Sequence, residues 1–170
     1  MALEIERKFL LPEYPEQLIQ DGVLVILSEQ RIEQTYLAID EQQEVRVRRI
    51  VDINSEDVQF THTFKAGNGL AREEIEYGIT ASIYEQLTNA RKLVPLTKNR
   101  ITAQWEGLTV EIDCYDQIQL TVLEVEFDSE SAAHAFEPPA WFGRDISAER
   151  QYSNKKVWRD LQSRGAGQPL

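Results

Sequence analysis

Charged side chains occupy alternate positions in residues 3–11, close to the start of the sequence. On a β-strand, successive side chains point to opposite faces, so Glu4, Glu6 and Lys8 share one face. Two carboxylates and an ammonium on one face can bind a hard metal cation and an anion side by side. This segment therefore predicts a charged site built on a strand.

The same alternation of charged residues returns along most of the chain, and each block carries mainly one sign. The acidic blocks are Glu4 and Glu6, Glu74 and Glu76, Glu111 and Asp113, and Glu124 and Glu126. The basic blocks are Lys8, Arg46 and Arg48, Lys65, Arg72, and Lys98 and Arg100. Solvent-facing strand surfaces usually mix both signs, because like charges opposite each other destabilise a sheet. Segregation by sign favours a ligand of the opposite charge for each block.

The two kinds of block suit different ligands. Carboxylates suit Mg²⁺, which takes oxygen ligands and needs few of them from protein. Arginine side chains suit phosphate, whose oxygens they can contact in pairs. A site that contains both predicts a metal–polyphosphate complex. Alternation does not distinguish an inward face from an outward one, so the blocks converge only if the sheet curls with its charged side inside.

The ordered set of blocks resembles the CYTH superfamily, the triphosphate tunnel metalloenzymes. The resemblance runs over about residues 3–160, from Glu4-x-Glu6-x-Lys8 to the Tyr152-Ser153-Asn154 segment. Residues 32–37, followed by Val45-Arg46-Val47-Arg48, resemble the second and third strands of the short bacterial members. The resemblance implies an α+β fold, in which a closed eight-stranded antiparallel β-barrel forms a tunnel lined by these charges, with helices packed outside.

The resemblance also implies the chemistry, which is metal-dependent hydrolysis of a linear triphosphate with one or two Mg²⁺ or Mn²⁺ ions. The implied phosphate-binding residues are Lys8, Arg46, Arg48, Lys65, Arg72, Lys98 and Arg100. The implied ligands of the first metal ion are Glu4, Glu6, Glu124 and Glu126. Glu111 and Asp113, with Glu74 and Glu76 as supporting tunnel carboxylates, remain for a second ion or for orienting the attacking water. The catalytic set is Glu4, Glu6, Lys8 and Lys65.

The family includes inorganic triphosphatases, thiamine triphosphatases and adenylate cyclases, so several substrates stay open. The short length and residues 32–37 and 150–154 most resemble the bacterial tripolyphosphatases. We therefore predict cleavage of tripolyphosphate to pyrophosphate and phosphate. The alternatives are an adenylate cyclase, or a thiamine or nucleoside triphosphatase, on the same tunnel fold. A further alternative is a noncatalytic module that binds polyphosphate or nucleotides through the basic strands. The last alternative is a soluble barrel whose charged residues merely face water.

Composition limits the other classes of function. The net charge of −11 argues against a nucleic-acid partner, since a basic surface supplies most of that affinity. A small anionic phosphate remains the expected partner, and the family resemblance allows a homodimer. The lone Cys114 cannot form an intramolecular disulfide, and residues 23–27, the longest apolar run, are too short to span a membrane. Charged strand residues begin too early for a signal peptide, so we expect a cytoplasmic protein.

The length of 170 residues predicts one domain, over residues 1–162, followed by a disordered tail at 163–170. Helices are expected at 16–20, from Thr80 or Ser82 to near Leu93, at 129–136 and from about residue 153. His62 is expected to point away from the tunnel. Tyr36 is expected either in the tunnel or in the core.

Overall fold

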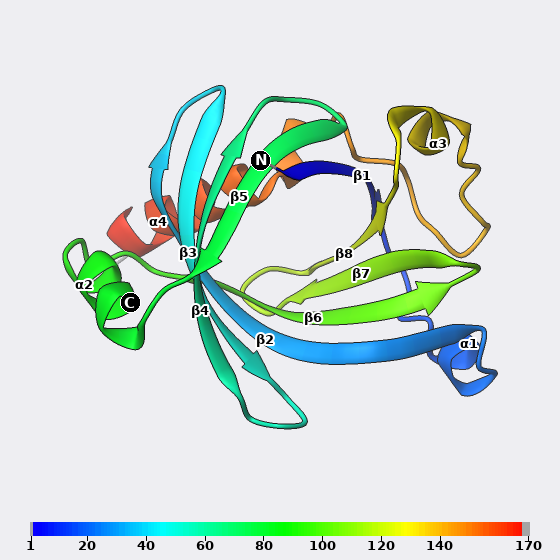
Figure 1. Cartoon of the computed structure of the whole chain (residues 1–170), viewed down its shortest axis with the longest axis horizontal. Coiled ribbons are helices and arrows are strands. Elements are labelled where there is room, and N and C mark those ends of the chain that lie inside the picture. Colours follow the sequence, from blue (N-terminus) through cyan, green and yellow to red (C-terminus); the bar gives the residue numbers. More distant parts are fainter. Residues whose placement is uncertain (1, 168–170) are drawn as a thin grey trace.

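The computed structural model describes residues 2–167, and the main feature of these residues is a closed β-barrel (Figure 1). Its eight strands are β1 (Ala2–Leu10), β2 (Leu24–Ile39), β3 (Gln43–Asp52), β4 (Val58–Ala66), β5 (Ala71–Gly78), β6 (Leu96–Trp105), β7 (Leu108–Tyr115) and β8 (Leu120–Glu126). All eight pairings are antiparallel, and the strands follow one another around the barrel in the order β1-β5-β4-β3-β2-β6-β7-β8. The predicted fold class is confirmed.

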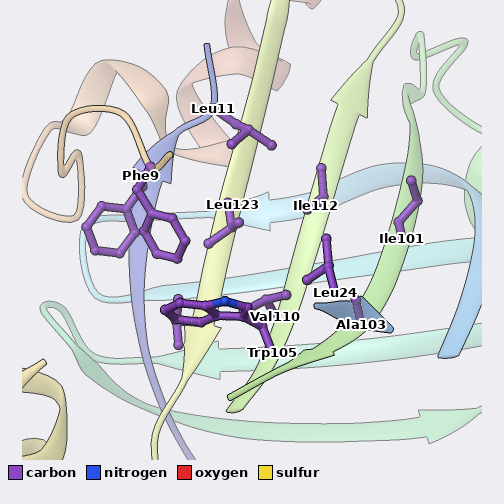
Figure 2. Close-up of a cluster of buried hydrophobic side chains, with 11 residues drawn as sticks. Phe9, Leu11, Leu24, Ile101, Ala103, Trp105, Val110, Ile112 and Leu123 are labelled. Atoms are coloured by element: carbon purple, nitrogen blue, oxygen red, sulfur yellow. The ribbon is translucent and has the colours of Figure 1, made fainter. Parts of the chain in front are cut away.

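Most apolar residues of β6, β7 and β8 lie on the outer face of the barrel, because they alternate with the charged residues. Leu123 and Val125 flank Glu124, for example, and both are fully buried. They belong to a cluster that also contains Phe9 and Trp105, part of which Figure 2 shows. The main hydrophobic core therefore lies outside the barrel wall and leaves its interior to polar groups.

Two short helices and the segment after the second cover this outer core. Helix α1 (Glu16–Gln20) contributes Leu18 and Ile19, while Phe136 and Trp141 follow helix α3 (Glu130–Ala135). The Ser129 side chain accepts a hydrogen bond from the backbone N–H of Ala132 and so caps α3. These elements exclude water from the outer face of β6–β8.

A second apolar cluster fills one end of the barrel. Tyr36 and Val122 belong to it and meet Val157 and Trp158 of helix α4 (Asn154–Gly167), which follows the short helix η1 (Arg150–Tyr152). Val122 lies two positions from Glu124 and shares its inward face, so α4 covers this end of the interior. Helix α4 continues to Gly167, past the expected domain end at residue 162. The remainder of the expected tail, 168–170, lies outside the described residues.

Helix α2 (Ala81–Asn89) packs against the outer face of β3 and β4, where Tyr84 contacts Phe60 at 5.0 Å between ring centroids. Thr80 caps this helix, since its hydroxyl accepts a hydrogen bond from the backbone N–H of Ile83. The helix ends at Asn89, earlier than the sequence predicts. Within residues 2–167, no helix is both long and apolar enough to cross a membrane.

Candidate functional site

The interior of the barrel holds a cavity of about 1050 Å³ whose wall is rich in charge. Most of the residues predicted to bind metal or phosphate line it. These are Glu4, Glu6, Lys8, Arg46, Arg48, Lys65, Arg72, Glu74, Glu76, Arg100, Glu111, Glu124 and Glu126. The charged blocks of the sequence therefore share one space, because their strand faces all turn inward.

Strand order separates the two signs around the cavity. The neighbouring strands β7, β8, β1 and β5 carry the inward carboxylates, and we call them the acidic half. The neighbouring strands β4, β3, β2 and β6 carry most of the inward cations, and we call them the basic half. Lys8 and Arg72 are cations of the acidic half, and Glu44 is a carboxylate of the basic half.

In the acidic half, carboxylates stand close to other carboxylates. Glu6 is opposite Glu126 in register, and Glu111 is opposite Glu124. Burial raises the pKa of Glu6 well above its usual range, and the neighbouring Glu124 charge adds to this effect. A hydrogen bond with Glu111, together with burial, raises the pKa of Glu126 to about 8. These carboxyl groups therefore share protons when no cation lies among them.

Glu124 stays ionised in this group. Burial alone would raise its pKa, but the charge of Lys8 and a hydrogen bond from Glu6 together hold the pKa of Glu124 at about 2. One oxygen of Glu6, Oε2, is buried without a hydrogen-bond partner. The acidic half thus contains an ionised carboxylate beside an unsatisfied carboxyl oxygen, which is a donor set that suits a hard cation.

Lys65 joins the two halves. Its Nζ lies 2.7 Å from Glu4 Oε2 on β1 and 3.2 Å from Glu74 Oε2 on β5. Burial opposes ionisation of Glu4, but the Lys65 ammonium outweighs it and lowers the pKa of Glu4. This contact places a cation where metal and phosphate sites would meet.

Arg46 and Arg48, on β3, are buried cations in the cavity wall. Burial opposes the charge of Arg46, but Tyr36 and the Glu44 carboxylate outweigh it and raise the pKa of Arg46. Their exposed fractions are 4% and 6%, and neither has a carboxylate oxygen within ion-pair distance among residues 2–167. Arg48 Nε donates to Gln34 Oε1 at 3.0 Å, whereas Arg46 Nε has no partner. Burial, with repulsion from Arg46 and Arg100, lowers the pKa of Arg48 to about 10. Buried positive charge of this kind favours binding of an anion.

Arg100 enters the same space from β6 but is held by carboxylates of β7. Its Nε lies 2.7 Å from Asp113 Oδ1, and its Nη2 lies 2.8 Å from Asp113 Oδ2. Its Nη1 lies 2.5 Å from Glu111 Oε2. Arg100 is therefore fixed in one orientation at the border between the basic and acidic halves.

Lys98 and Asp113 do not line the cavity, although the sequence predicts that they bind phosphate and metal. Lys98 is 0% exposed and Asp113 is 1% exposed, and Lys98 Nζ lies 2.8 Å from Asp113 Oδ2. Lys98 is opposite Tyr115 in register, and its Nζ lies 5.4 Å from the centre of that ring. Both side chains lie near the apolar cluster under α4, where the barrel interior is filled.

Some wall residues were missed by the sequence prediction. Glu44, 2% exposed, lies 3.3 Å from Arg72 and 3.7 Å from Lys155 of α4. It lies two positions before Arg46, so the same alternation could have found it. Lys155 and Arg159 also line the cavity, and their four-residue spacing on a helix was the available signal.

The remaining sequence expectations concern His62, Tyr36 and Cys114. His62 is absent from the cavity wall and packs on Tyr77, with ring centres 5.1 Å apart. Tyr36 both lines the cavity and packs on Trp158, so its two expected positions are combined. Cys114 is half-buried and follows Asp113 on the opposite strand face.

The described residues contain no group of three His, Cys, Asp or Glu side chains already gathered as a metal site. The carboxylates stand instead as pairs. Mg²⁺ is usually bound by only one or two carboxylates, with water and phosphate oxygens as its other ligands. The paired arrangement thus fits a cation that arrives together with its phosphate ligand.

Comparison with known proteins agrees with this geometry. The model of the CYTH domain family matches residues 2–157. An inorganic triphosphatase of Nitrosomonas europaea is 33% identical over 158 residues, which cover 91% of this chain and 95% of the relative. An inorganic triphosphatase of Acetivibrio thermocellus is 29% identical over 160 residues, covering 92% and 94%.

Solved structures show the same architecture. The crystal structure of an inorganic triphosphatase matches with a TM-score of 0.62 at 31% identity, covering 93% of this chain and 95% of that one. A Pyrococcus horikoshii protein, PH1819, matches with a TM-score of 0.58 at 16% identity, covering 93% and 89%. At this identity, the similarity to PH1819 shows a shared fold and nothing about function.

Proposed function

The chain belongs to the CYTH domain family, and from this premise we propose that it is a metal-dependent inorganic triphosphatase that cleaves tripolyphosphate to pyrophosphate and phosphate. The observation that carries the proposal is the pair Arg46 and Arg48, which are buried and have no ion pair in the part of the chain that the structure describes. They face a cavity whose other half holds proton-sharing carboxyls. The first feature favours a polyanion and the second a metal cation. A metal–triphosphate complex satisfies both.

In this proposal, the basic half binds the phosphate chain. Phosphoryl transfer needs the chain held in line with its charge neutralised, and it needs little covalent help. Arg46 and Arg48 bind nonbridging oxygens at the centre of the wall, with Arg100 on β6 beside them. Lys8 and Lys65 bind oxygens nearer the acidic half. Arg72 on β5 is a further phosphate ligand, for which Glu44 Oε1 competes at 3.3 Å from Arg72 Nη2.

The acidic half holds the metal ion through Glu4, Glu6, Glu124 and Glu126, with Glu111 beside them. Bound Mg²⁺ or Mn²⁺ supplies positive charge that stabilises the phosphate oxygens and makes a neighbouring water more acidic. Glu6 and Glu126 would bind a metal ion as carboxylates, so metal binding would release their protons to solvent. Glu74 and Glu76 line the same cavity from β5 and would serve a second metal ion or orient the attacking water.

Attack by water needs no nucleophilic side chain. Cys114 is the only cysteine and lies on the face opposite Asp113, away from the cavity wall. A noncatalytic polyphosphate binder would gain nothing from a half-wall of carboxylates facing its anionic ligand. The carboxylates therefore favour hydrolysis over binding alone. The cytoplasmic location and the homodimer stay predictions.

The test is release of phosphate by the purified protein with Mg²⁺, and separately with Mn²⁺. Tripolyphosphate, ATP and thiamine triphosphate are compared side by side, and the ATP products are examined for cyclic AMP. The proposal predicts rapid turnover of tripolyphosphate, far above that of the other two. Cyclic AMP from ATP would replace hydrolysis by cyclisation. Tight binding of tripolyphosphate without any turnover would instead indicate a binding module.

A further inference from the structure

Lys98 and Asp113 form a buried hydrogen-bonded network with Arg100, on the side of Arg100 away from the cavity. Lys98 Nζ contacts Asp113 Oδ2 at 2.8 Å, and both oxygens of Asp113 also accept from the Arg100 guanidinium, at 2.7 and 2.8 Å. The three side chains come from the neighbouring strands β6 and β7, where Arg100 is opposite Asp113 in register. The carboxylate therefore lies between the Arg100 guanidinium and the Lys98 amine, whose pKa burial lowers to about 7.

The three side chains of this network differ in their access to the cavity. Arg100 lines the cavity, whereas Asp113 and Lys98 have almost no exposed surface and do not line it. A metal ion or a phosphate could reach Asp113 only by displacing Arg100 or Lys98. Either exchange would break a buried contact of the Asp113 carboxylate and leave its partner without a hydrogen-bond acceptor, which is strongly unfavourable. Direct contact with a ligand is therefore unfavourable for both residues.

The geometry instead favours an indirect role. A carboxylate that accepts hydrogen bonds from both Nε and Nη2 fixes the plane of the guanidinium. Without these bonds the guanidinium would move at the end of a flexible side chain. The remaining N–H groups of Arg100 then keep one direction relative to the cavity. Lys98 Nζ contacts the same carboxylate from the other side, at 2.8 Å from Oδ2.

We propose that Asp113 and Lys98 are positioning residues that hold Arg100 in the orientation that binds phosphate, and that neither contacts the metal or the substrate. The inference rests on the proposed function and revises two of the sequence-predicted ligands. It predicts that every effect of Asp113 and Lys98 on triphosphate binding passes through Arg100.

The test is a double-mutant cycle that measures binding of tripolyphosphate without metal, by calorimetry with a chelator present. The variants are Asp113→Asn, Lys98→Met and Arg100→Met, and each of the first two combined with the third. Magnesium affinity in the absence of tripolyphosphate is measured on the same proteins. Asp116→Asn is the matched control, since it breaks the exposed Arg31–Asp116 ion pair just beyond β7.

The expected result is a tenfold or greater loss of tripolyphosphate affinity in Asp113→Asn, with magnesium affinity changed less than twofold. In the Arg100→Met background, Asp113→Asn and Lys98→Met should each change tripolyphosphate affinity less than twofold. Asp116→Asn should match the wild type. Magnesium affinity lowered tenfold by Asp113→Asn would restore its role as a metal ligand and overturn the inference.

A second arm covers the case in which Asp113→Asn does not fold. Lys98→Met keeps a long apolar side chain beside Tyr115 and leaves Asp113 paired with Arg100. If Lys98 binds phosphate directly, its loss lowers tripolyphosphate affinity equally with and without Arg100, and the inference fails. A wild-type protein that binds no tripolyphosphate would contradict the proposed function itself, and the two failures remain distinct.

Discussion

The acidic and basic halves of the barrel wall both bury charged side chains, but they differ in whether those side chains can become neutral. A carboxylate can take up a proton, and the raised pKa values of Glu6 and Glu126 indicate that the acidic half does so. Arginine keeps its charge at any ordinary pH, so Arg46 and Arg48 remain cations without a carboxylate partner. The acidic half can thus rest without metal, whereas the basic half depends on an anion. Phosphate binding should therefore be separable from metal binding.

The largest expected effect comes from the acidic half. Glu4→Gln combined with Glu6→Gln removes two carboxylates of the proposed metal site and should lower metal-dependent turnover of tripolyphosphate about 1000-fold or more, because metal charge stabilisation is worth several kcal/mol. The fold should persist, since Lys65 keeps Glu74 as a partner. Steady-state kinetics and circular dichroism measure both. Glu73→Gln, on the outward face of β5, is the control, and activity of the double variant within tenfold of wild type would refute the metal site.

The basic half should show the opposite relation between stability and function. Arg46→Met with Arg48→Met should reduce kcat/KM for tripolyphosphate about 100-fold or more, since charge-assisted hydrogen bonds contribute about 1.5–3 kcal/mol each. The ligand-free single variant Arg48→Met should melt a few degrees higher, because burial and the neighbouring Arg46 and Arg100 charges disfavour the Arg48 cation. Arg49→Met, on the outward face of the same strand, should change neither property. A lower melting temperature with full activity would mean that the two arginines stabilise the fold.

Proton sharing gives the acidic half a pH dependence. The pKa of Glu126 is raised to about 8, so its carboxyl holds a proton at pH 7 and loses it above pH 8. Magnesium must displace this proton to bind, and stabilisation by Mg²⁺ alone should therefore increase between pH 6.5 and 8.5. Thermal melts with and without Mg²⁺ across this range provide the measurement. Glu126→Gln should flatten the dependence, and equal stabilisation at both pH values would contradict proton sharing.

The smallest expected effect concerns Glu44, a carboxylate on the basic half. It pairs with Arg72 at 3.3 Å and with Lys155 at 3.7 Å, so it competes with any anion at the mouth. Glu44→Gln should raise metal-free affinity for tripolyphosphate about two- to fivefold, measured by calorimetry. Glu33→Gln, which faces outward on β2, provides the comparison. A loss of affinity would instead show that Glu44 holds Arg72 in its binding position.

The sharing of one strand face by most charged side chains could be predicted from the sequence, because alternation on a strand is local. Glu124 between Leu123 and Val125 already separates a polar face from an apolar one. Which face lines the barrel came from the family resemblance. The separation into an acidic and a basic half could not be predicted from alternation, because it depends on strand order, which places β5 beside β1 and β2 beside β6.

The position of each residue along the barrel axis could not be predicted from alternation either. Arg100 and Lys98 share one strand face, but only Arg100 reaches the cavity, because α4 and its apolar neighbours occupy the interior near Lys98. Alternation along a strand shows which face of the strand a residue occupies. It does not show how far the residue lies from the end of the barrel that α4 covers. The contribution of Lys155 to the wall was missed for a related reason, since the docking of α4 is a long-range contact.

In the proposed function, the basic half binds the phosphate chain and the acidic half binds the metal ion. Binding of tripolyphosphate to three proteins without metal tests this assignment most directly. Calorimetry in the presence of a chelator compares the wild type, the Glu4→Gln/Glu6→Gln variant and the Arg46→Met/Arg48→Met variant. The predicted result is that the first two bind tripolyphosphate with similar affinity and the third binds at least about 100-fold more weakly. Equal affinity of all three, or loss of binding only in the glutamate variant, would contradict a phosphate site built on the basic half.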